Sequence, residues 1–228
     1  MKYYVFIVTS RDDPLYEQFD NMRREQMKAI GIHYKFLLNG KVPDKYLLKD
    51  DEEYYPDSSF TPGMFVKFYN ACKNLKGDYE HIVRVNSSTF INFQELNYLE
   101  LPKYNFFGGP VVVEKHVPYA FISGTVMIFS RDVIYRLINE IPINNNISIE
   151  YPDDVALSYI INGILKMDMT QMIDKLIVYS EVISESYNIY LPDRVLFIRV
   201  RNEKVREKND IYVWKELMRL SGIKLISN

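Results

Sequence analysis

The chain has 228 residues, a length that usually forms one large domain or one domain with a small appendage. Hydrophobic residues make up 47% and charged residues 25% of it, close to the globular average, which excludes the disordered and fibrous classes. The net charge of −2 argues against a nucleic-acid-binding protein, because such proteins usually carry a basic excess or stripe. The single cysteine, Cys72, excludes an intrachain disulfide and a multi-cysteine metal cluster.

The first residues predict a buried strand rather than a targeting signal. Residues 3–8 are apolar, but the polar residues 9–13 follow at once, whereas a signal peptide has a longer apolar region and a small-residue cleavage site. No stretch approaches the roughly 18 to 20 apolar residues that cross a bilayer. We therefore expect a soluble, cytoplasmic protein with no transmembrane segment.

Strands and amphipathic helices alternate in the first half of the chain. We expect strands over residues 3–9, 34–38 and 81–85 and helices over 13–30 and 63–75. The first strand is a continuous β-branched and aromatic run, which is typical of a strand buried on both faces. This alternation predicts a parallel sheet with helices on its faces.

The second half is less regular, although it still predicts a single domain. We expect strands over residues 106–109, 124–129 and 195–200 and helices over 131–140, 155–162 and 210–220. No internal repeat, low-complexity segment or linker marks a boundary, so residues 1–228 are treated as one domain.

The pattern excludes several common catalytic sites. Residues 9–14, which follow the first strand, match neither the glycine-rich dinucleotide loop nor the P-loop. There is no Gly-x-Ser-x-Gly nucleophile elbow. The three histidines, His33, His81 and His116, lie far apart without metal-ligand spacing, and we assign them to strand ends and loops.

Five short motifs follow one another between residues 60 and 165. They are Lys67 with the segment Ile82–Asn92, then Phe107-Gly108, Pro118–Gly124, Ser130–Val133 and Tyr151–Val155. Their order and spacing resemble the β-1,3-galactosyltransferase/Fringe-type glycosyltransferases. That family has a basic helix residue, an Asp-Asp-Asp triplet, an aromatic-Gly strand, a Pro-x-Tyr-x-x-Gly segment and a Glu-Asp-Val motif.

The resemblance implies an α/β fold of the GT-A type, a Rossmann-like mixed sheet with helices on both faces. Such a fold holds a nucleotide-sugar at the C-terminal ends of its strands. The nucleotide-binding half would cover about residues 1–92 and the acceptor-side half about residues 93–228. Small soluble domains of this kind also resemble sugar transferases encoded by large DNA viruses.

The aspartate triplet that holds Mn²⁺ in that family is missing. Asn86, Ser87 and Ser88 align with it, and neutral amide and hydroxyl groups are poor ligands for a divalent metal on a pyrophosphate. The alignment implies that these residues contact the ribose or the donor sugar. Alternatively they only connect a strand to a turn, because Asn and Ser favour turns. We predict no required cofactor, with Mn²⁺ as the alternative.

Asp154 aligns with the catalytic aspartate of the Glu-Asp-Val motif. Inverting sugar transfer needs a base that removes the proton of the acceptor hydroxyl, and a carboxylate at a loop–helix junction can do this. Asp153 is the alternative base. Either residue could instead cap the helix that starts near Val155.

Two groups of residues are candidates for donor binding. Thr9, Ser10 and Arg11 leave the first strand where the fold implied by the resemblance places the uridine, and Lys67 and Arg84 could add charge nearby. The alternative is that all of them are solvated polar ends.

The second donor-binding group is a basic segment after the last strand. Arg199 and Arg201 fall on the same face by alternation, and Asp210 could orient Arg206 across one helical turn. Guanidinium groups bind phosphate bidentately, so we expect these arginines to neutralise the pyrophosphate in place of a metal. The alternative is a solvated charge run.

Acceptor contact is expected from Tyr119 and Phe121, with Ser123 and Gly124 of the same motif. The sequence thus predicts a glycosyltransferase that moves a sugar from a UDP-linked donor to a hydroxyl of a glycan or glycoprotein. The rival hypothesis is a degenerate, inactive GT-A-like protein that only binds a nucleotide or a glycan. Release of UDP from UDP-sugars distinguishes the two.

Overall fold

The computed structural model describes residues 2–11, 14–39, 46–55, 61–180, 189–202 and 204–223. The strands are β1 (Tyr3–Ser10), β2 (His33–Asn39), β3 (Glu52–Tyr54), β4 (His81–Asn86), β5 (Thr89–Ile91), β6 (Phe107–Gly109), β7 (Val111–Val112), β8 (Phe121–Ile122), β9 (Val126–Ser130), β10 (Met169–Gln171), β11 (Leu176–Tyr179) and β12 (Phe197–Val200). The helices are α1 (Pro14–Ile30), α2 (Gly63–Asn74), α3 (Phe93–Tyr98), α4 (Arg131–Glu140), α5 (Asn146–Glu150), α6 (Asp153–Ser158) and α7 (Arg206–Leu220). A π-helical segment, Tyr159–Ile164, continues α6, and Ile173–Lys175 form a 3-10 turn.

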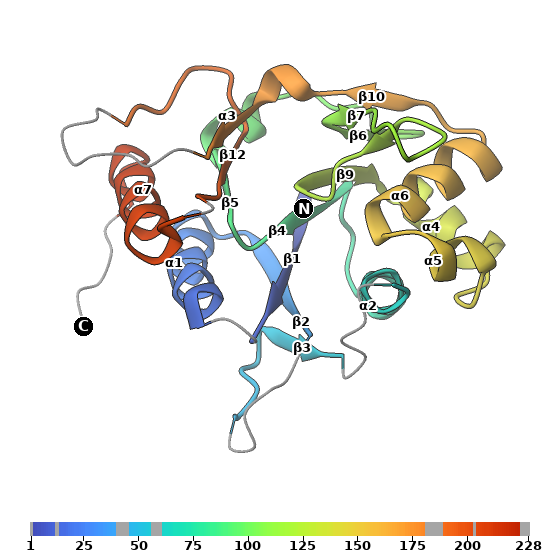
Figure 1. The fold of residues 1–228 in the computed structure, drawn as a ribbon, viewed down its shortest axis with the longest axis horizontal. Helices are drawn as coiled ribbons and strands as arrows, with labels where there is room; N and C mark the ends of the chain where they lie inside the picture. Colours follow the sequence, from blue (N-terminus) through green and yellow to red (C-terminus); the bar gives the residue numbers. More distant parts are fainter. Residues whose placement is uncertain are drawn as a thin grey trace.

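A seven-stranded mixed sheet forms the centre of the described chain, in the order β10-β6-β9-β4-β1-β2-β3 (Figure 1). β1 is parallel to both β2 and β4, as the alternating first half predicts. β9 runs antiparallel to β4 and to β6 and makes the sheet mixed. The parallel strands bring the C-terminal ends of β1, β2 and β4 to one edge of the sheet.

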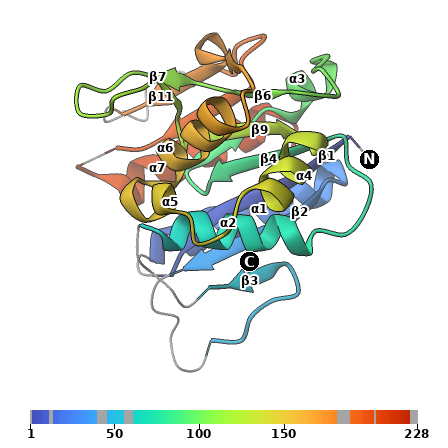
Figure 2. The ribbon, with the colours of Figure 1, turned by 90° about the vertical axis from the view of Figure 1, so that its right-hand side faces the viewer.

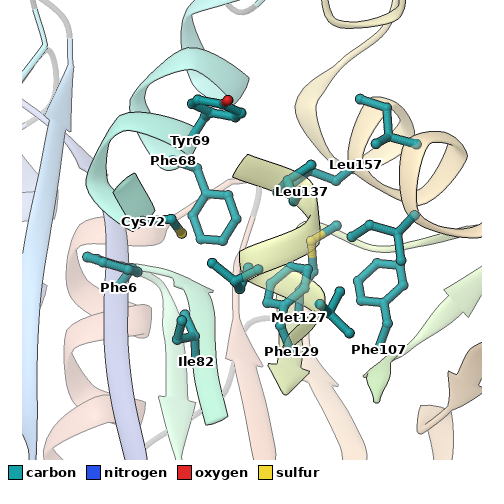
Figure 3. Packing of buried hydrophobic residues seen from close by; sticks show 14 of the residues in the cluster. Phe6, Phe68, Tyr69, Cys72, Ile82, Phe107, Met127, Phe129, Leu137 and Leu157 are labelled. Carbon is teal, nitrogen blue, oxygen red and sulfur yellow. The ribbon is translucent and has the colours of Figure 1, made fainter. Parts of the chain in front are cut away.

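Helices cover both faces of this sheet, with α2, α4 and α6 on one side and α1, beside α7, on the other (Figure 1, Figure 2). Residues 3–8 of β1 are all apolar because alternate residues enter different cores: Tyr4 and Phe6 face the α2 side, and Val5 and Ile7 face the α1 side. On the α2 side, Phe6 lies against Phe68 with ring centroids 6.0 Å apart (Figure 3). No helix in the described ranges combines the length and the apolar character that crossing a membrane requires.

A second, three-stranded sheet, β11-β12-β5, contains the predicted C-terminal strand. That strand is shorter than predicted, and it pairs with β11 and β5 rather than joining the main sheet. Arg199 of β12 lies opposite Thr89 of β5 in this register. The pairing therefore brings the C-terminal basic segment next to the turn that follows β4.

A fully buried carboxylate, Asp20 of α1, connects the ends of β1 and β4. It accepts hydrogen bonds from Thr9 Oγ1 at 2.9 Å, Ser87 Oγ at 2.7 Å and Arg11 Nη1 at 2.7 Å. Arg11 also forms an ion pair with Glu52 of β3 at 2.9 Å. Burial raises the pKa of Asp20, and the bonds from Arg11, Ser87 and Thr9 favour the ionised form and offset part of that effect.

Replacement of this carboxylate should destabilise the whole fold. We expect Asp20→Ala to lower the free energy of unfolding by about 3–5 kcal/mol, because it leaves a buried guanidinium without one of its partners. Urea denaturation measures the change. Glu216→Ala is the matched control: its exposed ion pair with Arg219 at 2.9 Å should be worth at most about 1 kcal/mol. Equal effects of the two substitutions would show that Asp20 does not hold the strand ends.

Candidate functional site

A cleft of about 440 Å³ opens at the sheet edge where β1, β2 and β4 end. Thr9 and Ser10, from the end of β1, line it together with Asn86, Ser87 and Ser88, from the end of β4 and the following turn. Thr9 and Ser87 each donate their hydroxyl proton to Asp20 beneath them. Their oxygen lone pairs are therefore suited to accept hydrogen bonds from a ligand with hydroxyl groups, such as a ribose.

Arg84 of β4 organises one wall of the cleft. Its guanidinium forms an ion pair with the Asp153 carboxylate through Nη2 and donates to the Gly124 carbonyl through Nη1. Both Arg84 and Asp153 are buried. The ion pair fixes Asp153 as the partner of Arg84, so the two adjacent aspartates have different surroundings.

Asp154 is the more accessible of the two carboxylates, and its Oδ2 accepts the Gly124 N–H at 2.9 Å. Burial and the neighbouring Asp153 raise the pKa of Asp154, while the hydrogen bond from Gly124 opposes the rise. A Cβ atom at position 124 would lie 3.0 Å from Arg84 Nη1 and 3.1 Å from Asp154 Oδ2, so a side chain there would crowd both groups. Pro152, rather than Asp153 or Asp154, occupies the cap position of α6, although Asp154 Oδ1 accepts the Val155 N–H of its first turn at 3.0 Å.

The C-terminal basic segment forms a second wall, which contains Arg199, Arg201 and Arg206. Arg199 is held by a hydrogen bond from Nη1 to the Thr125 hydroxyl. Burial, with Arg201 and Arg206 nearby, lowers its pKa, as expected where like charges gather without enough counter-ions. The expected link from Asp210 is confirmed, since its Oδ2 lies 3.3 Å from Arg206 Nε.

Four of the predicted site residues do not line this cleft. Arg11 is committed to the ion pairs beneath the floor. Lys67 of α2 is fully buried and donates to the Leu37 carbonyl at 3.2 Å and to Asn39 Oδ1 at 2.9 Å.

The other two residues outside the cleft belong to the predicted acceptor motif. Phe121 is buried in β8, whereas its neighbours Ser123 and Gly124 line the cleft. Tyr119 packs against Tyr159, with ring centroids 4.7 Å apart, and against Tyr151 at 5.8 Å. The three rings form an aromatic cluster beside the start and end of α6.

The side chains that line the cleft are a poor ligand set for a divalent metal ion, because such an ion prefers several hard anionic oxygens. Asn86, Ser87 and Ser88 are neutral, Asp153 is paired with Arg84, and Asp154 is the remaining carboxylate among the described lining residues. Across the described ranges, no cluster of three His, Cys, Asp or Glu side chains is arranged to hold a metal ion.

The cleft also contains residues that the sequence did not single out, namely Val8, Tyr16, Asn39, Met64 and Thr125. Asn39 could have been predicted as a site residue, because it ends a strand that is parallel to β1 and should therefore reach the same edge of the sheet. Thr125 follows Gly124 directly. Tyr16 and Met64 lie in the first turns of α1 and α2 and carry no comparable signal.

Comparison with known proteins gives matches among solved structures only. No protein-family model and no curated protein matches the chain. The galactosyltransferase LgtC in complex with donor and acceptor sugar analogues is 10% identical, with a TM-score of 0.52 over 99% of this chain and 98% of that one. The inositol-1-phosphate CTP transferase of T. maritima is 7% identical, with a TM-score of 0.56 over 98% of each chain. The catalytic domain of Drosophila β1,4-galactosyltransferase 7 is 14% identical, with a TM-score of 0.46 over 96% of this chain and 80% of that one.

The first two matches, with the topology, identify the fold class as α/β with a Rossmann-like mixed sheet and helices on both faces. More particularly, the chain has the GT-A fold, as predicted. One of these two neighbours is named as a sugar transferase and the other as a nucleotidyl transferase. At this level of identity the likeness describes the fold, and the reaction has to be argued from the cleft.

The buried amine of Lys67 should give the protein a specific pH dependence. Burial and the nearby Arg84 lower the pKa of Lys67 to about 7, against the opposing effect of Asp153. Between about pH 7 and pH 10 the unfolded chain therefore holds a proton on this lysine that the folded chain has lost, so stability rises with pH in that window. We expect Lys67→Met to remove this part of the rise in the free energy of unfolding between pH 7 and pH 9.5.

Urea denaturation of both proteins at the two pH values measures this difference. Lys215→Met, at an exposed position of α7, serves as the control and should keep the pH dependence of the wild type. The same pH dependence in Lys67→Met as in the wild type would contradict the lowered pKa.

Proposed function

We propose that this protein is a glycosyltransferase that moves a sugar from a UDP-sugar to a hydroxyl group of a glycan. The observation that carries the proposal is one cleft, at the C-terminal sheet edge of a GT-A fold, that combines an arginine wall with a hydrogen-bonded carboxylate. A cationic wall suits a diphosphate, and an accessible carboxylate suits proton removal. LgtC has been crystallised in complex with donor and acceptor sugar analogues, which supports a cleft that receives both a sugar donor and an acceptor.

The proposed chemistry is a single displacement at the anomeric carbon. The acceptor hydroxyl oxygen forms a bond to that carbon, the bond from the carbon to the diphosphate oxygen breaks, and the hydroxyl proton passes to Asp154. The product sugar is then inverted at that carbon. The raised pKa of Asp154 brings it closer to neutral pH and makes it a stronger base than an ordinary aspartate. Arg84 keeps Asp153 occupied, which supports Asp154 as the base of the pair.

The leaving diphosphate needs compensating charge, and this stabilisation is often the largest catalytic contribution. Arg199, Arg201 and Arg206 supply it in this proposal, without a metal ion. The Thr125 hydroxyl fixes Arg199, and Asp210 and Tyr16 fix Arg206, whose Nη1 lies 3.5 Å from the tyrosine hydroxyl. Side chains held in this way need little reorganisation when the negative charge develops.

The acceptor is proposed to enter beside Ser123 and Gly124, which lie next to Asp154. Tyr119 and Phe121 belong to the same segment, Tyr119 in the aromatic cluster and Phe121 beneath the surface. Tyr119 is half-buried and its hydroxyl lies inside the protein, so the part that it offers to a sugar is the apolar part of its ring. Tyr119 is therefore assigned to acceptor contact and Phe121 to support of that segment.

A degenerate protein that only binds nucleotide or glycan is the rival function. The assay that decides is incubation with UDP-sugars and an oligosaccharide acceptor mixture, with detection of released UDP. Acceptor-dependent release supports the transferase. Tight UDP binding without any turnover would establish the binding protein instead.

Asp154→Asn should lower kcat by about two to four orders of magnitude, the usual contribution of a general base, with little change in UDP affinity or melting temperature. Asp153→Asn is the matched control: it should mainly lower the melting temperature, because it leaves Arg84 buried without its counter-ion. UDP release, calorimetry and thermal melts measure the three quantities. Unchanged kcat in Asp154→Asn would remove this residue from the mechanism, and retention in the product, seen by NMR, would exclude the single displacement.

Arg199→Ala and Arg206→Ala should each weaken UDP binding by about 1.5–3 kcal/mol, the range for hydrogen bonds between charged groups. Lys204→Ala, in the same basic segment but outside the cleft, should bind UDP normally. EDTA should leave most of the activity intact. Loss of turnover in EDTA together with normal UDP binding by both arginine variants would overturn the metal-independent proposal.

A further inference from the structure

The side chain of Asn39 is held in one orientation at the end of β2. The backbone carbonyl oxygen of Asn39 accepts hydrogen bonds from the Arg11 backbone N–H and from the Ser10 hydroxyl, both at 3.4 Å, and these bonds attach the end of β2 to the end of β1. Its Oδ1 accepts a hydrogen bond of 2.9 Å from Lys67 Nζ. The residue lines the cleft, whereas Lys67 lies behind it in the core.

Lys67 determines which end of the Asn39 amide faces the cleft. The lysine donates to two acceptors, Asn39 Oδ1 and the Leu37 carbonyl. Both the ammonium and the neutral amine have at least two protons, so both forms can make these two bonds. The amide oxygen therefore faces Lys67 in either charge state. The Nδ2 group, a hydrogen-bond donor, is turned away from the lysine.

Asn39 lies at the end of the cleft away from the proposed reaction centre. β2 is separated from β4 by β1, and neighbouring strands are about 4.8 Å apart, which places Asn39 about 10 Å from the end of β4. Asp154 lies beyond β4, against Gly124 that precedes β9. If the sugar of the donor lies at Asp154 and its diphosphate lies at the arginine wall, the nucleobase is the part of the donor that reaches Asn39. This step rests on the proposed function.

We propose that Lys67 is a positioning residue that makes Asn39 select uracil over cytosine. Uracil has a carbonyl oxygen at C4, which accepts a hydrogen bond from the Asn39 amide. Cytosine has an amino group at that position, so two donors would face each other and both would lose their hydrogen bonds. A site built around one hydrogen bond discriminates strongly against a base that leaves its groups unpaired.

Titration calorimetry of the full chain with UDP and with CDP tests this selection, because the two ligands share ribose and diphosphate. We expect the wild type to bind UDP at least about tenfold more tightly than CDP. Asn39→Asp has the same shape but offers only acceptors, so the preference should reverse in favour of CDP. Asn39→Leu, which neither donates nor accepts, should bind both nucleotides about equally.

Lys67→Met tests the positioning role separately. Without the lysine the amide is free to turn over, so the ratio of UDP to CDP affinity should fall to about one to threefold. A purely structural role for the lysine would lower the melting temperature and weaken both nucleotides alike, with an unchanged ratio, and that result would overturn the inference. Equal binding of UDP and CDP by the wild type would also overturn it while leaving the donor site intact. Binding of neither nucleotide would remove the proposed function and this inference together.

Discussion

The cleft depends on a carboxylate that a ligand need not touch. Asp20 is buried beneath the floor and joins three donors from two strand ends and the loop beside them. Burying an ion is unfavourable unless every oxygen is satisfied, so this arrangement is stable in one geometry only. The hydroxyls of Thr9 and Ser87 are therefore fixed before any ligand arrives. The same carboxylate positions Arg11, which ties the first strand to the edge of the sheet through Glu52.

The charged side chains of the cleft fall into two sets: some pair with each other, and the others are available to a ligand. Arg84 and Asp153 neutralise each other in the wall, which leaves Asp154 for the proposed role of base and the C-terminal arginines for the proposed diphosphate site. In the proposed reaction the guanidinium groups of Arg199, Arg201 and Arg206, which line the cleft, compensate the charge of the leaving diphosphate. Under this proposal, side chains alone supply the positive charge at the leaving group.

The long elements could be predicted from the sequence, because their apolar periodicity is strong. The helix expected over residues 131–140 coincides with α4, and β1, β2 and β4 lie within one or two residues of their expected bounds. β5 and β11 could not be predicted, because strands of three and four residues owe their shape to pairing partners distant in sequence. From the sequence pattern alone, Asp20 would be placed on the polar face of an amphipathic helix, and Lys67 would be placed at the surface. Only the packing shows that both are buried.

The register of β12 against β5 has a consequence for biosynthesis. The strand ends of the first ninety or so residues form the floor of the cleft, but Arg199 and Arg206 are translated more than a hundred residues later. Phe90 of β5 and Trp214 of α7, whose rings lie 5.3 Å apart, add a second contact between these two regions of the chain. The strands β1, β2, β3 and β4 of the central sheet are therefore synthesised well before the arginines that are proposed to hold the diphosphate. Under the proposed function, diphosphate binding therefore requires that the segment containing Arg199 and Arg206 has been synthesised and has packed against β5 and α1.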